Sequence, residues 1–223
     1  MGVESGGPVI SIASSLWRRW VLAFTLGELI GFGGIPLLGG SVTLWLTEGM
    51  QSGPRALLLY AVAVGGGFGE GTVLAAFQMR VLRDYLPLLS ARRWILVTAL
   101  AAALAWACGM LAPTLDDLIN LSAWAQVAIW IPASLLILFS IGGAQAWVLR
   151  GVVDAPQRWI TANLLGWLAG LPWTFVLPAL VPETAPLAVW VVTFVIAAVL
   201  MGLTAGAVTG HFLLRMIYPA PLK

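Results

Sequence analysis

Residues 158–170 read RWITANLLGWLAG, and the arrangement of this stretch recurs twice elsewhere in the chain. In each copy an Arg-Trp pair is followed, seven residues after the Trp, by a small residue, with a second small residue four positions further on. The three copies are Arg19-Trp20 with Gly27 and Gly31, Arg93-Trp94 with Ala101 and Ala105, and Arg158-Trp159 with Gly166 and Gly170. Each copy opens an apolar stretch, so the pattern predicts three helices of one kind.

A second pattern lies at the ends of the three apolar stretches that follow these helices in the chain. Their last residues are Val81-Leu82-Arg83, Val148-Leu149-Arg150 and Leu213-Leu214-Arg215. Gln lies five residues before the Arg in the first two, at Gln78 and Gln145, whereas the third has Gly210. We therefore predict one helical hairpin used three times, over residues 17–83, 92–150 and 157–215, within a single membrane domain that covers 1–223.

The composition places this repeat in a membrane. Hydrophobic residues make up 61% of the 223 residues and charged residues only 9%, whereas a soluble domain carries about 25% charged residues. A helix needs about 20 apolar residues to cross the hydrocarbon core. The predicted fold is therefore an all-α integral membrane protein with six spans, at 20–37, 56–79, 94–112, 123–148, 159–180 and 187–214.

Prolines mark three of the predicted helix ends. Pro36, Pro113 and Pro182 fall at the outer ends of the first, third and fifth spans, where a residue without an amide hydrogen should stop a helix. The sequence stays apolar from residue 37 to 46, beyond Pro36. The first helix can therefore instead continue with a kink, or the chain can fold over the outer surface.

The basic residues orient the six spans. One side of the bundle receives ten of them and the other side only Arg55. Because Lys and Arg gather in cytoplasmic loops, we expect both termini in the cytoplasm of a plasma or inner membrane. The ten are Arg18, Arg19, Arg80, Arg83, Arg92, Arg93, Arg150, Arg158, Arg215 and Lys223.

Each part of the hairpin has an expected physical role. Arg19, Arg93 and Arg158, each with the Trp that follows it, should anchor the cytoplasmic interface, with the indole rings at headgroup depth. Arg83, Arg150 and Arg215 should anchor the returning helices. The pairs of small residues should let helix backbones approach closely, because burial of apolar surface does not drive helix association in lipid.

This pattern resembles a broad group of uncharacterised multi-pass membrane proteins, common in cyanobacteria and filamentous phototrophic bacteria. Their hairpins carry a Trp-anchored helix with a small-xxx-small seam, followed by a Gly-rich helix that ends in Leu-Arg. The resemblance covers Trp20 to Arg215 and brings no assigned activity. The middle hairpin here has Ala in place of Gly, and the last one lacks the Gln.

Two acidic residues are expected at membrane depth. Glu28 lies about 12 Å beyond Trp20, and Glu70 about 15 Å before Arg80, at a rise of 1.5 Å per residue. Ionisable groups there cost several kcal/mol and are functional candidates. The pair can be a cation or proton site or an acceptor for a polar ligand. Alternatively, each is a neutral acid that bonds a neighbouring helix. The glycines from Gly65 to Gly69 would let such a partner come close.

The other polar candidates are Gln78, Gln145 and His211. The two glutamines are expected to bond neighbouring helices near the cytoplasmic interface. His211 can ligate haem iron or a chlorophyll magnesium, but a lone histidine is a poor metal site, and a hydrogen bond to a helix or headgroup is the alternative. We therefore predict neither a cofactor nor a metal.

No catalytic motif is recognisable, and the connections between spans are short, so an enzyme is not expected. The basic residues favour anionic lipid headgroups and give no support for nucleic-acid binding. We expect an accessory or scaffold subunit that packs against other membrane proteins, lipids or pigments. One alternative is a small-molecule transport or binding component, which resembles the substrate-binding subunits of energy-coupling-factor transporters in size and topology only. The other is an ion or proton pathway through Glu28 and Glu70.

The basic asymmetry makes the orientation testable. Reporter fusions at residues 86, 154 and 223 should all report a cytoplasmic location, because each follows a basic segment. A fusion at residue 117 should report the opposite side. One reproducible reversal among these four sites would contradict the six-span orientation.

Overall fold

The computed structural model describes residues 7–219, apart from the side chains of residues 7–11, 36–38, 41 and 44. Over that range the regular elements are all α-helices, which confirms the predicted helical class. They are α1 (Gly7–Leu46), α2 (Ser52–Tyr85), α3 (Ala91–Ile119), α4 (Ala123–Leu149), α5 (Arg158–Gly170), α6 (Pro172–Ala179) and α7 (Leu187–Ile217).

Five segments within the described residues are long and apolar enough to cross a membrane: α2, α3, α4, α7 and the combined stretch Arg158–Ala179, which holds α5 and α6. The chain is therefore a multi-pass membrane protein. Helix α1 is not among these five, so a sixth span within it stays a prediction.

The proline stop at Pro113 is wrong, whereas at Pro36 the alternative that the first helix continues is the one confirmed. Helix α1 continues past Pro36 to Leu46, and α3 continues past Pro113 to Ile119. A membrane helix tolerates proline because neighbouring groups satisfy the freed backbone atoms. What ends α3 is Asn120, which adopts the left-handed conformation (φ 53°), with its amide bonded to the carbonyl of Asp116. Pro182 does lie in a connection, after α6.

The fifth predicted span has a break that the sequence analysis did not anticipate. Helix α5 ends at Gly170 and α6 starts at Pro172, with Leu171 between them. Proline is favoured in the first turn of a helix because its missing amide hydrogen needs no partner there. Pro172 therefore starts a new short helix.

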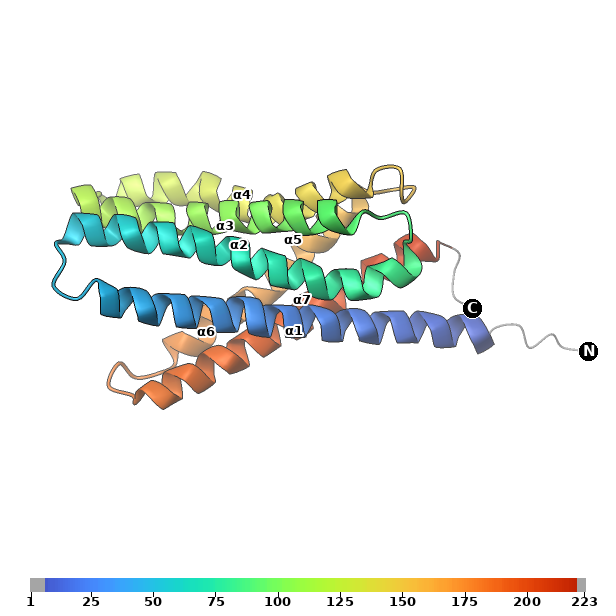
Figure 1. Ribbon diagram of the computed structural model, residues 1–223, viewed down its shortest axis with the longest axis horizontal. Helices are drawn as coiled ribbons and strands as arrows, with labels where there is room; N and C mark the ends of the chain where they lie inside the picture. The colour runs from blue at the N-terminus through green and yellow to red at the C-terminus, as the bar shows by residue number, and fades with distance from the viewer. Residues whose placement is uncertain (1–6, 220–223) are drawn as a thin grey trace, which may run out of the picture.

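The helices form a closed ring, which we call the six-helix ring, with α5 and α6 counted together as one member. Each helix packs against its neighbours in the chain, and α7 packs against α1. Figure 1 shows the long helices running side by side, with α1 and α2 adjacent along most of their length. The first and last helices of the chain therefore complete the ring.

Basic side chains lie at one end of the ring. Figure 1 places the starts of α1, α3 and α5 and the ends of α2, α4 and α7 at this end, which we call the basic end. Arg55 and the acidic residues Glu48, Asp116, Asp117 and Glu183 belong to the opposite end. Lys223 lies outside the described residues. The arginines of the basic end are Arg18, Arg19, Arg80, Arg83, Arg92, Arg93, Arg150, Arg158 and Arg215.

The predicted small-residue seams lie at helix contacts in the first and third pairs of helices. A Cβ atom added at Gly27 would lie 3.0 Å from the Cα of Leu74 on α2. One added at Gly170 would lie 3.0 Å from the carbonyl oxygen of Met201 on α7. Gly31 and Gly166 make similar approaches to α2 and α7. In the second pair, Ala101 is buried and Ala105 half-buried.

Gly166→Leu tests the seam between α5 and α7. A Cβ there would already lie 3.0 Å from Thr209 Cγ2, so a leucine should lower the free energy of unfolding by about 1–3 kcal/mol. Gly143→Leu on α4 is the matched control, because nothing lies within 4 Å of a Cβ at Gly143. Thermal unfolding in detergent measures both, and equal effects would show that the seam assignment is wrong.

Candidate functional site

Three tryptophans meet in the centre of the six-helix ring. Trp20, Trp94 and Trp159 come from α1, α3 and α5 and are 0–1% exposed. The ring centroids of Trp20 and Trp159 are 5.6 Å apart in an edge-to-face arrangement, and those of Trp94 and Trp159 are 6.2 Å apart. The expectation that these rings anchor the headgroup region is therefore wrong, because they face the protein interior and not the lipid.

Each of these indole N–H groups donates a hydrogen bond to a different helix. Trp94 Nε1 donates to Gln78 Oε1 (3.0 Å) and Trp159 Nε1 to Gln145 Oε1 (2.8 Å). Trp20 Nε1 donates to Thr209 Oγ1 (2.9 Å). The bonds run from α3 back to α2, from α5 back to α4, and from α1 to α7. They therefore join one pair of helices to the next and close the ring.

Gln145 connects two of these bonds. Its Nε2 donates to Gln78 Oε1 at 3.0 Å and to Thr98 Oγ1 at 2.9 Å. An indole nitrogen can only donate, so the oxygen of Gln145 must face Trp159 and its two amide hydrogens must face elsewhere. The network is internally consistent, with both hydrogens of this buried amide paired. Sequence reasoning placed both glutamines between helices but did not identify Thr98.

The third junction shows why Gln is missing from the last copy. A Cβ at Gly210 would lie 2.9 Å from Cδ1 of Trp20 and 3.1 Å from Cδ1 of Trp17. Two indole rings therefore occupy the space that a glutamine side chain would need. Thr209, the preceding residue, supplies the acceptor oxygen instead. The only sequence signal for its role was its position beside the expected Gln.

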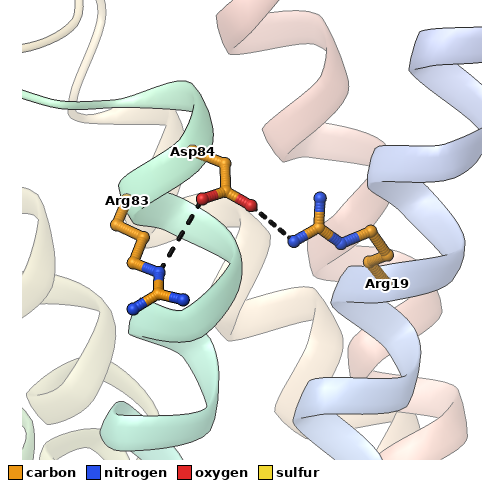
Figure 2. A network of polar contacts seen from close by, with 3 residues as sticks. All are labelled: Arg19, Arg83 and Asp84. Atoms are coloured by element: carbon orange, nitrogen blue, oxygen red, sulfur yellow. Dashed lines mark hydrogen bonds and ion pairs between the residues drawn. The ribbon is translucent and has the colours of Figure 1, made fainter.

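The arginine anchors are exposed at the basic end. Arg19 on α1 forms an ion pair with Asp84 on α2, with 2.5 Å between Arg19 Nη2 and Asp84 Oδ2. Arg83 Nε lies 3.7 Å from the same carboxylate (Figure 2). Because both partners are nearly half exposed, such a pair contributes at most about 1 kcal/mol. The other proposed anchors, Arg93, Arg150, Arg158 and Arg215, are exposed as well.

Glu70 lies inside the bundle between α2 and α3. It is 6% exposed, and its Oε2 accepts a hydrogen bond of 2.6 Å from Trp106 Nε1. A Cβ atom at Gly67 would overlap the Trp106 ring. Gly67 therefore leaves the space that the Trp106 indole occupies beside Glu70. The sequence analysis did not identify Trp106 as a partner of Glu70.

Glu28 lies between α2 and α7, the two neighbours of its own helix. It is 0% exposed, and neither carboxyl oxygen has a hydrogen-bond partner. A Cβ at Gly31 would lie 3.1 Å from Cγ of Glu70, and one at Gly202 would lie 3.3 Å from Cβ of Glu28. Gly31 lies three residues, about one helical turn, after Glu28, so the two glutamates occupy neighbouring positions where α1 packs against α2. We call them the carboxyl pair.

The remaining candidate is not joined to these groups. His211 is exposed on α7 near the basic end, with its ring edge-on to Phe212 at a centroid distance of 6.4 Å. Within the described residues, no three His, Cys, Asp or Glu side chains lie together in a way that could hold a metal ion.

Comparison of the chain with protein-family models, curated proteins and solved structures finds no match.

Gln145→Leu tests the tryptophan–glutamine network. The change leaves the indole N–H of Trp159 without an acceptor and removes the Gln145 donor from Gln78 Oε1. A buried unpaired polar group costs about 1–3 kcal/mol. We expect a loss of about 2–4 kcal/mol in the free energy of unfolding in detergent. Ser134→Ala is the control on the same helix, because Ser134 is exposed and bonds only the Trp130 carbonyl. A loss no larger than that of the control would contradict the network.

Proposed function

We propose that the chain spans the membrane six times, with both ends in the cytoplasm, as three copies of one hairpin. The support for a sixth span is that α1 packs along both α2 and α7. Its 40 residues give a length of about 60 Å, twice the hydrocarbon thickness of about 30 Å. The support for the repeat is that equivalent tryptophans form equivalent bonds at all three junctions.

We further propose that this protein is a non-enzymatic subunit of a membrane complex in the plasma or inner membrane. It binds other membrane proteins through the half of its ring that lies away from the basic end, which we call the divergent half. The observation that carries the proposal is poor internal packing there. Helix α6 has no buried residue. Only Ala133 is buried between residues 123 and 140 of α4, and none is buried between residues 187 and 196 of α7.

The shape of the ring agrees with such a partner surface. Figure 1 shows α6 and the start of α7 diverging from α3 and α4 at the end opposite the basic end. Large apolar side chains are exposed on these segments, including Trp124 (83%), Phe175 (69%) and Leu180 (74%). Lipid covers such a surface adequately, but van der Waals packing against another helix stabilises it further.

Partners must be contacted mainly within the membrane plane. The connections between consecutive helices cover residues 47–51, 86–90, 120–122, 150–157 and 180–186. Such short connections present little surface to water at either end. The exposed arginines of the basic end add an attraction for anionic lipid headgroups.

Extraction in a mild detergent or a lipid nanodisc tests the subunit proposal. The 23.6 kDa chain should migrate in a larger assembly that contains a second polypeptide, either another subunit or a second copy. The double variant Phe175→Ala, Leu180→Ala should weaken that assembly, because it removes apolar contact area from the divergent half.

The double variant Leu22→Ala, Leu100→Ala is the matched control, since both leucines are exposed on α1 and α3. An assembly that survives the control and not the first variant supports the proposal. A single chain with lipid only, or equal losses in both variants, would contradict it. A small molecule retained at fixed stoichiometry would favour the transport alternative instead.

A further inference from the structure

Among the described residues, the Glu28 carboxyl is the buried side-chain group whose oxygens lack a hydrogen-bond partner. It is fully buried. An ionised carboxylate in such a place costs several kcal/mol unless an opposite charge or donors compensate it. The neutral acid avoids that cost, so the surroundings of Glu28 favour a bound proton.

Glu70 has the opposite character. The indole N–H of Trp106 donates to it at 2.6 Å, and a donor of this kind stabilises a carboxylate oxygen. An indole cannot accept, so this oxygen of Glu70 is fixed as an acceptor. The carboxyl pair is therefore asymmetric, since one member has a fixed donor and the other has none.

The elements packed against Glu28 bring few other charges to this level. Helix α2 brings a second carboxyl group, that of Glu70, next to Gly31, one helical turn from Glu28. Helix α7 brings Gly202. The titratable side chains of α7, His211 and Arg215, lie about 14 Å or more further toward the basic end at 1.5 Å per residue. Within the described residues the ion pairs are those of Asp84 with Arg19 and Arg83, and neither glutamate is paired with a basic side chain.

We propose that Glu28 and Glu70 form an intramembrane proton-binding site, in which Glu28 binds the proton and Glu70 is the neighbouring carboxyl group held in place by the Trp106 hydrogen bond. Binding forms one O–H bond on the Glu28 carboxylate, removes one negative charge and needs no co-reactant. The donor and recipient of the proton is water.

Proton release from this site is coupled to helix packing. Gly202 brings α7 so close to α1 that a Cβ there would lie 2.8 Å from the Cα of Thr25. Gly27 and Gly31 bring α2 equally close on the other side. An ionised Glu28 needs water, which enters only if one of these contacts loosens. The proton therefore holds α1, α2 and α7 together.

Labelling with dicyclohexylcarbodiimide tests the site, because this apolar reagent adds to protonated carboxyl groups within membranes. The full-length protein is labelled in phosphatidylcholine–phosphatidylglycerol vesicles between pH 5 and 10, and adducts are located by peptide mass spectrometry. Glu28 should be modified, and above the midpoint the modified fraction should fall about tenfold for each pH unit. Asp84, which is exposed, should remain unmodified.

Two variants make the assignment specific. Glu28→Gln should abolish the adduct at that position. Glu70→Gln should leave Glu28 reactive but move the midpoint to lower pH, because the negative neighbour that favours the proton is gone. No adduct at Glu28 at any pH, a yield that does not depend on pH, or a midpoint unchanged in Glu70→Gln would each overturn the proposal.

The pH dependence of stability provides an independent measurement. The native protein holds a proton that an unfolded chain releases above about pH 4–5, so the free energy of unfolding should fall as pH rises. In Glu28→Gln that slope should disappear, whereas a Glu28 that is already ionised in the native protein predicts an unchanged slope. Glu70→Leu should destabilise at every pH, because it orphans the Trp106 N–H.

Discussion

The structure depends on the need to satisfy three indole N–H groups where water is absent. In the interior of a membrane bundle a tryptophan nitrogen must donate to another protein group or remain unpaired at a cost of about 1–3 kcal/mol. Trp94, Trp159 and Trp20 each solve this by donating to the helix that precedes them around the ring. For Trp20 the preceding helix is α7, so the same requirement that joins one pair of helices to the next also joins the first and last helices of the chain.

The hydrogen bonds of the tryptophans determine which helices are neighbours, and glycine residues determine how closely those helices approach. Gly27 and Gly31 serve the contact of α1 with α2, and Gly202 and Gly206 serve its contact with α7. Helix α1 is therefore held closely on two sides, and Glu28 lies where both contacts meet. The exclusion of water from Glu28 follows from this double contact. The halves of α4, α6 and α7 that lie away from the basic end lack such contacts, and there the helices diverge and expose large apolar side chains.

Much of this arrangement could be predicted from the sequence, and the failures have physical causes. Composition and the length of the apolar stretches predicted the helical membrane class, and charge asymmetry predicted which helix ends share one end of the bundle. The tryptophans were assigned to the wrong environment, because an Arg-Trp pair has the same sequence whether its ring faces headgroups or the interior. Trp106 and Thr209 were missed because hydrogen bonds between helices have no fixed spacing along the chain. The break at Leu171 and the run of α3 past Pro113 depend on neighbouring helices, which a local pattern does not contain.

Ring closure between α1 and α7 is the central claim, and disulfide cross-linking measures it directly. In a Cys108→Ala background, which removes the native thiol, the pair Phe24→Cys and Gly206→Cys should oxidise readily in native membranes. A Cβ at Gly206 lies 3.1 Å from Cβ of Phe24, near the 3.5–4.5 Å (about 3.8 Å on average) found in disulfides. The control pair Leu22→Cys and Gly206→Cys should not oxidise, because Leu22 is 60% exposed. Rapid disulfide formation in the first pair alone is the predicted result. Equal formation in both pairs, or none in the first, would contradict a closed ring.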